Sequence, residues 1–185
     1  MHEENPVARI FWGRVNVQTA TSFLFFSKKG RVQSLIHQLK YKHQKEVGIY
    51  MGNLFGQSLI ESPFYSNLDF IIPVPLHPKK LNIRGYNQSL MIAVGMNKSM
   101  KIDVFHGLVR KLHSSTQTKK SRYQRWENVK DIFEVLEPEK LEGKRVLLID
   151  DVLTTGATLE ACATVISDIP DIKIYIATLA YASLL

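Results

Sequence analysis

The stretch VLLIDDVLTTGATLEACA, residues 146–163, decides the fold of this chain. It begins with four apolar residues, continues with two adjacent aspartates, and then has three threonines around one glycine. We predict a buried strand at residues 144–150 and a helix at residues 158–169, and the apolar run at residues 172–180 predicts a second strand. A strand, a helix and another strand in this order form a parallel pair with a right-handed crossover.

The segments before this stretch extend the alternation of strands and helices. In chain order we predict a strand within 19–30, amphipathic helices at 31–44 and 46–61, a strand at 69–76 that runs into prolines, a helix at 87–100 with Asn87 as its N-cap, and a strand at 104–111. The sequence therefore predicts an α/β fold with a central, mostly parallel sheet flanked by helices. We expect a single domain, in which residues 1–66 pack on a core formed by residues 67–185.

Composition limits the class of protein. The chain has 185 residues, of which 45% are hydrophobic and 22% charged, as in an ordinary globular protein. Apolar runs are too short to span a bilayer and the first residues do not resemble a signal peptide, so we expect a cytoplasmic protein without a membrane partner. The single cysteine excludes an internal disulfide. The net charge of +7 favours an anionic partner, either a phosphorylated small molecule or a nucleic acid.

The adjacent aspartates, Asp150 and Asp151, lie where a ligand is expected. Ligands of parallel α/β sheets bind at the carboxyl ends of the strands, and successive side chains of a strand point to opposite faces. The residues that follow supply hydroxyl groups and backbone amides that lead into a helix N-terminus, which favours phosphate, and Gly156 permits a close approach of that phosphate. Carboxylates beside a phosphate site match a ribose 5-phosphate, whose 2′ and 3′ hydroxyl groups donate hydrogen bonds to them.

The residues VLLIDDVLTTGAT, 146–158, resemble the complete PRPP-binding motif of type I phosphoribosyltransferases, where PRPP is phosphoribosyl pyrophosphate. Without that resemblance, a strand-to-helix turn capped by threonines would account for them. Four more stretches make the whole chain similar to the ComF family, a competence-associated group of phosphoribosyltransferase-like proteins: NPVARIFWGR (5–14), LIHQLKYK (35–42), IIPVPLHPKKLNIRGYNQS (71–89) and TQTKKSRYQRWENVKDIF (116–133). Longer members of that family carry an N-terminal four-cysteine zinc module, which we expect this chain to lack.

The resemblance implies a role for each part of the site. Asp150 and Asp151 would be the catalytic pair and would hold the ribose directly or through water bound to magnesium, the implied cofactor. The turn after them would bind the 5-phosphate of PRPP through Thr154, Thr155, Gly156, Ala157 and Thr158. The loop after the first core strand would bind pyrophosphate through Pro73, Val74, Pro75, Leu76, His77, Lys79 and Arg84, with Lys80 beside them. A proline-stiffened turn at the start of a solvated basic helix would give the same pattern.

Residues from about 111 to 133 would form a flexible hood over the site. The resemblance places Lys111, Gln117, Lys119, Lys120 and Arg125 in this hood. Lys119 and Lys120 are also compatible with a solvated surface, and Arg125 with a contact that fixes the hood to the body of the domain.

The implied reaction transfers the 5-phosphoribosyl group of PRPP to a nitrogen acceptor and releases pyrophosphate. No residue of the sequence identifies the acceptor, and the expected ligand is PRPP or a related ribose phosphate. The alternative is a non-catalytic module that senses PRPP or a nucleotide and is linked to DNA uptake, through contact with single-stranded DNA or a DNA-processing protein. A homodimer is a further expectation.

Overall fold

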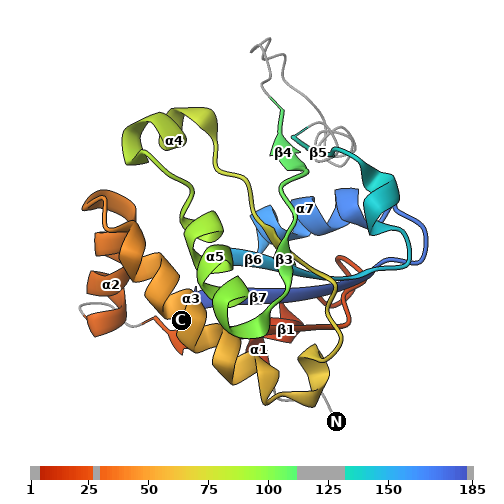
Figure 1. Cartoon of the computed structure of the whole chain (residues 1–185), viewed down its shortest axis with the longest axis horizontal. Helices are drawn as coiled ribbons and strands as arrows, with labels where there is room; N and C mark the ends of the chain where they lie inside the picture. The colour runs from red at the N-terminus through yellow and green to blue at the C-terminus, as the bar shows by residue number, and fades with distance from the viewer. Residues whose placement is uncertain (1–4, 27–29, 112–131, 183–185) are drawn as a thin grey trace.

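The structure is a computed structural model and describes residues 5–26, 30–111 and 132–182. Its centre is a five-stranded sheet in which all neighbouring strands are parallel (Figure 1). In sheet order the strands are β1 (Thr19–Phe25), β7 (Lys173–Tyr181), β6 (Arg145–Leu153), β2 (Phe70–Pro73) and β3 (Asp103–Val104). The predicted α/β fold with a central parallel sheet is therefore confirmed.

Helices cover both faces of this sheet, and each face has its own apolar core. In chain order they are α1 (Pro6–Arg9), α2 (Arg31–Tyr41), α3 (Lys45–Ile60), α4 (Pro78–Arg84), α5 (Gln88–Met100) and α7 (Ala157–Ile166), with 3-10 turns η1 (Pro63–Tyr65) and η2 (Pro138–Leu141). Leu147 and Ile149 of β6 pack with α2, α3 and α5, whereas Val146 and Leu148 pack with α1 and α7. Within the described residues, no helix is both long and apolar enough to cross a membrane.

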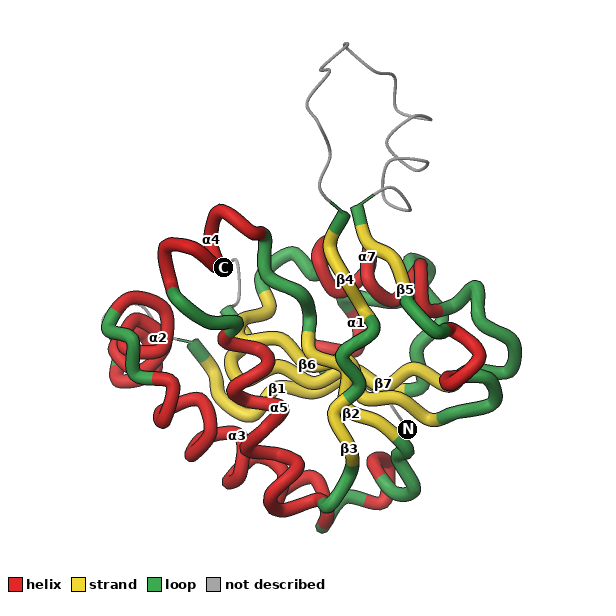
Figure 2. Tube along the Cα trace, turned by 45° about the horizontal axis from the view of Figure 1, so that its top comes forward, coloured by secondary structure: helices red, strands yellow, loops and turns green. Residues whose placement is uncertain are grey.

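A separate two-stranded ribbon stands beside the main sheet. Its strands, β4 (Leu108–Arg110) and β5 (Phe133–Val135), are antiparallel, and Leu108 pairs with Val135. Figure 2 shows the two strands running together away from the main sheet. The predicted hood begins where this ribbon ends, and residues 112–131 lie outside the described part of the chain.

The strand that carries the two aspartates is longer than predicted. We expected it to end at Asp150, but β6 continues to Leu153 because its last residues keep partners on β7. Asp150 pairs with Thr178 and Leu153 pairs with Tyr181. The acid pair therefore lies within a paired strand, near its carboxyl end. The chain changes direction after Leu153, three residues later than expected.

The sheet has a crevice between β2 and β6, because the chain leaves these two neighbours toward opposite faces. After β2 the chain passes through α4 and α5 to β3, and after β6 it passes through α7 to β7, on the other side. In open α/β sheets ligands bind at such a divergence, beyond the carboxyl ends of the strands. The loop after β2 and the turn after β6 meet at this crevice.

Two glycines let α3 and α5 approach very closely. A Cβ atom at Gly52 would lie 2.1 Å from the carbonyl oxygen of Ile92, and one at Gly95 would lie 2.1 Å from the carbonyl oxygen of Ile49. Carbonyl oxygens of a helix backbone cannot move aside as a flexible side chain can. This contact therefore fixes α5, whose first turn faces the crevice.

We expect Gly52→Ala and Gly95→Ala each to lower the free energy of unfolding by about 1–3 kcal/mol, because overpacking forces the two helices apart. Alanine favours an isolated helix by about 1 kcal/mol over glycine, so the two effects have opposite signs. Urea unfolding measures the difference, and Ser58→Ala, at an exposed position of α3, is the control that should stay within about 0.5 kcal/mol. Stability gains at Gly52 and Gly95 would contradict the close packing.

Candidate functional site

A cavity of about 200 Å³ lies at the crevice and brings together residues from distant parts of the sequence. Both aspartates line it, as do parts of the loop after β2 and the first turn of α5. Its charged and polar lining consists of Lys40, His77, Lys80, Arg84, Gln88, Ser89, Arg110, Asp150, Asp151 and Thr158. Four cationic side chains therefore surround two carboxylates.

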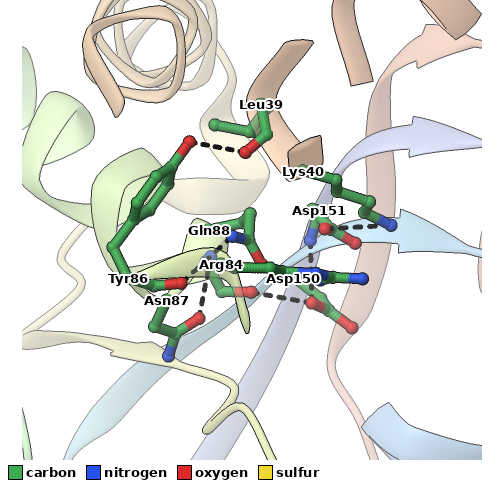
Figure 3. Close-up of polar contacts among 9 residues, drawn as sticks. Leu39, Lys40, Arg84, Tyr86, Asn87, Gln88, Asp150 and Asp151 are labelled. Atoms are coloured by element: carbon green, nitrogen blue, oxygen red, sulfur yellow. Dashed lines mark hydrogen bonds and ion pairs between the residues drawn. The ribbon is translucent and has the colours of Figure 1, made fainter. Parts of the chain in front are cut away.

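Asp150 is held by two donors at the floor of the cavity. Its Oδ1 accepts a hydrogen bond from the Ser89 hydroxyl at 2.8 Å and another from the Asp151 amide at 2.8 Å (Figure 3). Burial raises the pKa of Asp150 well above its ordinary value, and the charge of Asp151 raises it further, while the Ser89 hydrogen bond and the charge of Lys40 oppose both effects. Asp150 is therefore a carboxyl group that ionises reluctantly in the ligand-free protein.

Asp151 is turned to a different partner. Its Oδ2 lies 3.0 Å from Lys40 Nζ, and both side chains are largely buried (Figure 3). The end of α2 that carries Lys40 is itself fixed, because the Tyr86 hydroxyl donates a hydrogen bond to the carbonyl of Leu39. Separate partners for the two carboxylates explain how like charges can be adjacent in the sequence.

The turn after β6 surrounds a second, smaller hollow of about 40 Å³, next to the first. All five residues predicted to bind the 5-phosphate line it: Thr154, Thr155, Gly156, Ala157 and Thr158. Helix α7 begins at Ala157, whose amide donates to Thr155 Oγ1 at 3.4 Å, and the next two residues, Thr158 and Leu159, also line the hollow; amides at such positions lack partners within a helix. Its geometry is that of an anion site at a helix N-terminus.

Gly156 has a structural reason for being glycine in addition to the close approach of phosphate that we expect. Its φ is +79°, a conformation that side chains disfavour. A Cβ atom there would lie 2.7 Å from Ile10 Cγ2 and 3.3 Å from the Phe11 ring. The glycine therefore lets Ile10 and Phe11 pack closely against the turn.

Most of the residues predicted to bind pyrophosphate line the cavity. Val74, Pro75, Leu76, His77 and Arg84 do so, and Lys80 lies with them. Two predicted residues do not line the cavity: Pro73, which is buried at the end of β2, and Lys79, which is exposed on α4.

Hydrogen bonds hold this loop at both ends. The amide of Lys79 donates to His77 Nδ1 at 3.1 Å, so the imidazole caps α4. Asn87 Nδ2 donates to the carbonyl of Val74 at 2.9 Å, while Asn87 Oδ1 accepts from the amide of Ser89 and caps α5, as predicted. Asn87 thus joins the loop to the helix that supplies Ser89.

Of the predicted hood residues, only Lys111 is within the described chain. It continues the ribbon, with its amide donating to the carbonyl of Ile132 at 2.9 Å and its Nζ lying 3.8 Å from Glu134 Oε2. Gln117, Lys119, Lys120 and Arg125 lie outside the described residues. Arg110 of the ribbon lines the cavity, and its guanidinium lies over the Phe133 ring. Arg110 was not among the predicted site residues.

Three further polar residues of the cavity were not predicted: Lys40, Gln88 and Ser89. They lie in the stretches 35–42 and 71–89 that carry the family resemblance, but no role was assigned to them, because a polar residue on a predicted helix gives no sign of what faces it. The acid pair was the available signal, because a buried pair of carboxylates requires a nearby cation and hydrogen-bond donors.

The acid pair fits one kind of metal site and not another. The described residues contain no group of three or more His, Cys, Asp or Glu side chains arranged to hold a metal ion. Magnesium usually binds through one or two carboxylates, several waters and the phosphate oxygens of a ligand. Asp150 and Asp151 therefore suit a magnesium ion shared with a bound phosphate compound, and do not suit a closed structural metal site.

Comparison with known proteins gives one family and several solved structures. The phosphoribosyl transferase domain family matches residues 87–182, just over half of the chain. The glutamine phosphoribosylpyrophosphate (PRPP) amidotransferase from B. subtilis, complexed with ADP and GMP, is similar with a TM-score of 0.54 and 18% identity, over 77% of this chain and 30% of that one.

A structure described as the allosteric regulatory enzyme of purine biosynthesis is similar to the same degree, with a TM-score of 0.54 and 18% identity over 77% of this chain and 29% of that one. At this identity the similarity shows the fold. The chain spans less than a third of the length of either protein. No curated protein matches it.

The different surroundings of the two aspartates predict opposite effects on the stability of the ligand-free protein. Asp151→Asn should lower the free energy of unfolding by about 1–3 kcal/mol, because Lys40 loses its carboxylate partner in a buried place. Asp150→Asn should raise it at neutral pH, because asparagine keeps the two hydrogen bonds to Oδ1 without the reluctant charge. Equal effects of the two substitutions would contradict these assignments.

The effect of Asp150→Asn should also depend on pH. A carboxyl group whose pKa is raised by folding binds its proton more tightly when folded, so its contribution is favourable in acid and is lost as pH rises through the raised value. The stability gain of Asp150→Asn should therefore be small near pH 4 and grow as pH rises toward 8, in urea unfolding with chelator and without phosphate. A gain independent of pH would contradict the raised pKa.

Proposed function

This chain belongs to the phosphoribosyl transferase domain family, and we propose that it binds PRPP and transfers the 5-phosphoribosyl group to a nitrogen acceptor with release of pyrophosphate. One observation carries the proposal: the two aspartates, the turn before α7 and the loop after β2 surround adjoining hollows at the crevice between β2 and β6. A ribose that carries phosphate at one end and pyrophosphate at the other requires an anion site on each side of groups that bind the ribose hydroxyls.

In the proposed complex each part of PRPP has a counterpart. The 5-phosphate lies at the N-terminus of α7 and accepts hydrogen bonds from its first amides and from threonine hydroxyls. The ribose hydroxyls donate to Asp150 and Asp151. The pyrophosphate lies in the larger cavity, where the cations Lys40, Lys80, Arg84 and Arg110 offset its charge.

The chemistry requires separation of charge at C1 of the ribose. The acceptor nitrogen forms a bond to C1 while the bond from C1 to the pyrophosphate oxygen breaks, and the transition state resembles an oxocarbenium ion. The carboxylates stabilise the positive charge that develops on the ribose, and the cations stabilise the negative charge that develops on pyrophosphate. Asp150 and Asp151 would hold magnesium through water, and its positive charge would further stabilise the negative charge on the leaving pyrophosphate.

The alternative function uses the same binding site without turnover. Among the described residues that line the cavity, His77 is the one side chain besides the two aspartates that is suited to act as a base, and its Nδ1 already accepts the capping hydrogen bond of α4. A non-catalytic sensor of PRPP or a nucleotide needs no base for an acceptor. Its link to DNA uptake, contact with single-stranded DNA or a DNA-processing protein, a homodimer and a cytoplasmic location remain predictions from the sequence.

PRPP at about 100 times its dissociation constant should stabilise the protein by about 2.7 kcal/mol in the presence of magnesium. For a domain of this size that corresponds to a rise in Tm of about 5–10 °C. Ribose 5-phosphate should give a smaller rise, since it lacks the pyrophosphate. Failure of millimolar PRPP to shift Tm would overturn the proposed function.

Pyrophosphate release separates the enzyme from the sensor. The protein is incubated with magnesium and PRPP against a panel of nitrogen bases and amines, and release is compared with that in a reaction without acceptor. Release that depends on one acceptor supports transfer. Binding of PRPP without acceptor-dependent release across the panel would favour the sensor.

Two adjacent lysines of α4 test the assignment of the pyrophosphate site. Lys80→Met should weaken pyrophosphate binding about tenfold, because Lys80 lines the cavity. Lys79 lies on the same helix but does not line the cavity, so Lys79→Met removes the same charge and should change the dissociation constant by less than about twofold. Isothermal titration calorimetry with pyrophosphate measures both, and equal losses would show that only overall charge matters.

A further inference from the structure

Arg14 joins the segment after α1 to the turn that surrounds the smaller hollow, although 141 positions of sequence separate Arg14 from Thr155. Its Nη1 donates to the carbonyl of Thr155 at 2.9 Å and to the carbonyl of Ile10 at 3.1 Å. Its Nη2 forms an ion pair with Glu160 Oε2, and the two side chains are 38% and 27% exposed. One guanidinium therefore holds the turn and the first part of α7 together.

The position of Arg14 is set by a well-anchored segment. The side chain of Asn5 caps α1 by accepting from the amides of Val7 and Ala8, and its Nδ2 donates to the carbonyl of Ala20 in β1 at 2.8 Å. Phe11 is fully buried. Arg14 thus comes from a fixed support and not from a loose surface loop.

Glu160 makes this contact important for an anion. It lies in the first turn of α7, where its carboxylate competes with a bound phosphate for the positive field of the helix N-terminus. The ion pair with Arg14 offsets that charge, while the hydrogen bond to the Thr155 carbonyl fixes the turn. The contact of Ile10 with Gly156 supports the same turn.

We propose that Arg14 is a positioning residue for the 5-phosphate site, which neutralises Glu160 and holds the Thr155 carbonyl so that the turn stays shaped for a dianionic phosphate. The inference rests on the proposed function and extends it to the segment before the region matched by the family, residues 87–182. Arg14 itself is not among the residues that line either hollow. It acts through Glu160 and Thr155.

Two probes separate this role from general support of the fold. Ribose 5-phosphate uses the smaller hollow, whereas pyrophosphate uses the larger cavity. Arg14→Ala should weaken ribose 5-phosphate binding roughly tenfold, because Glu160 is left unpaired beside the phosphate, and should leave pyrophosphate binding within about twofold. Lys173→Ala is the control. It removes one positive charge from an exposed position at the start of β7, at the opposite end of the strands from the cavity, and should leave both affinities unchanged.

Variants of Glu160 give the opposite sign. Glu160→Gln should bind ribose 5-phosphate at least as tightly as the parent protein, since Arg14 then keeps an uncancelled charge near the phosphate. Arg14→Ala with Glu160→Gln should recover part of the lost affinity, and Arg14→Lys should recover the part due to charge. Glu160→Gln and Arg14→Lys also test the proposal if Arg14→Ala fails to fold.

Titration calorimetry at fixed ionic strength gives the two dissociation constants. The role of Arg14 would be overturned if Arg14→Ala left the affinity for ribose 5-phosphate unchanged, or weakened the affinities for ribose 5-phosphate and pyrophosphate equally. Either result would leave the proposed function intact. Weaker binding in Glu160→Gln would overturn the electrostatic part. If the parent protein bound neither ribose 5-phosphate nor PRPP, the proposed function would fail and this inference with it.

Discussion

Two adjacent carboxylates on one paired strand are the constraint on which the site depends. Asp150 and Asp151 are neighbours on β6, and each carboxylate must find its own compensation. Ser89 at the start of α5 serves Asp150, and Lys40 at the end of α2 serves Asp151. Both helices must therefore end or begin at the carboxyl edge of the sheet. The close contact of α3 with α5 and the hydrogen bond from Tyr86 to Leu39 hold them there.

The charges of the cavity bear on how the proposed ligand would bind. Lys40 lies against Asp151, and burial disfavours the ionised form of Asp150. In the proposed complex, pyrophosphate would offer Lys40 a second anionic partner, and the cations around it would make ionisation of Asp150 easier. Binding and ionisation should therefore support one another, because each relieves a charge that the other leaves uncompensated.

The sequence predicted the parallel sheet, the main helices and the turn before α7, because apolar periodicity and a local motif define them. Three features escaped it for physical reasons. The end of β6 depends on partners in β7, which are 28 positions away for Asp150 and Thr178. The roles of Lys40 and Arg110 depend on which helix or ribbon end lies over the carboxylates. The close contact of Gly156 with Ile10 joins residues far apart in the sequence, and no local pattern reveals it.

The region that the family matches, residues 87–182, does not contain the whole site. It supplies the two carboxylates, Ser89, Arg110 and the turn before α7, whereas Lys40, Lys80, Arg84 and the loop after β2 precede it. Within the described residues, the matched region thus contributes both carboxylates of the cavity and one of its four cations, Arg110. Arg14 repeats this division at the smaller hollow, because it offsets Glu160 of the matched region. Of the described residues that line the cavity, Lys40, Lys80 and Arg84 come from outside the matched region. The preceding residues therefore belong to the charged lining of the cavity, and not only to the packing of the fold.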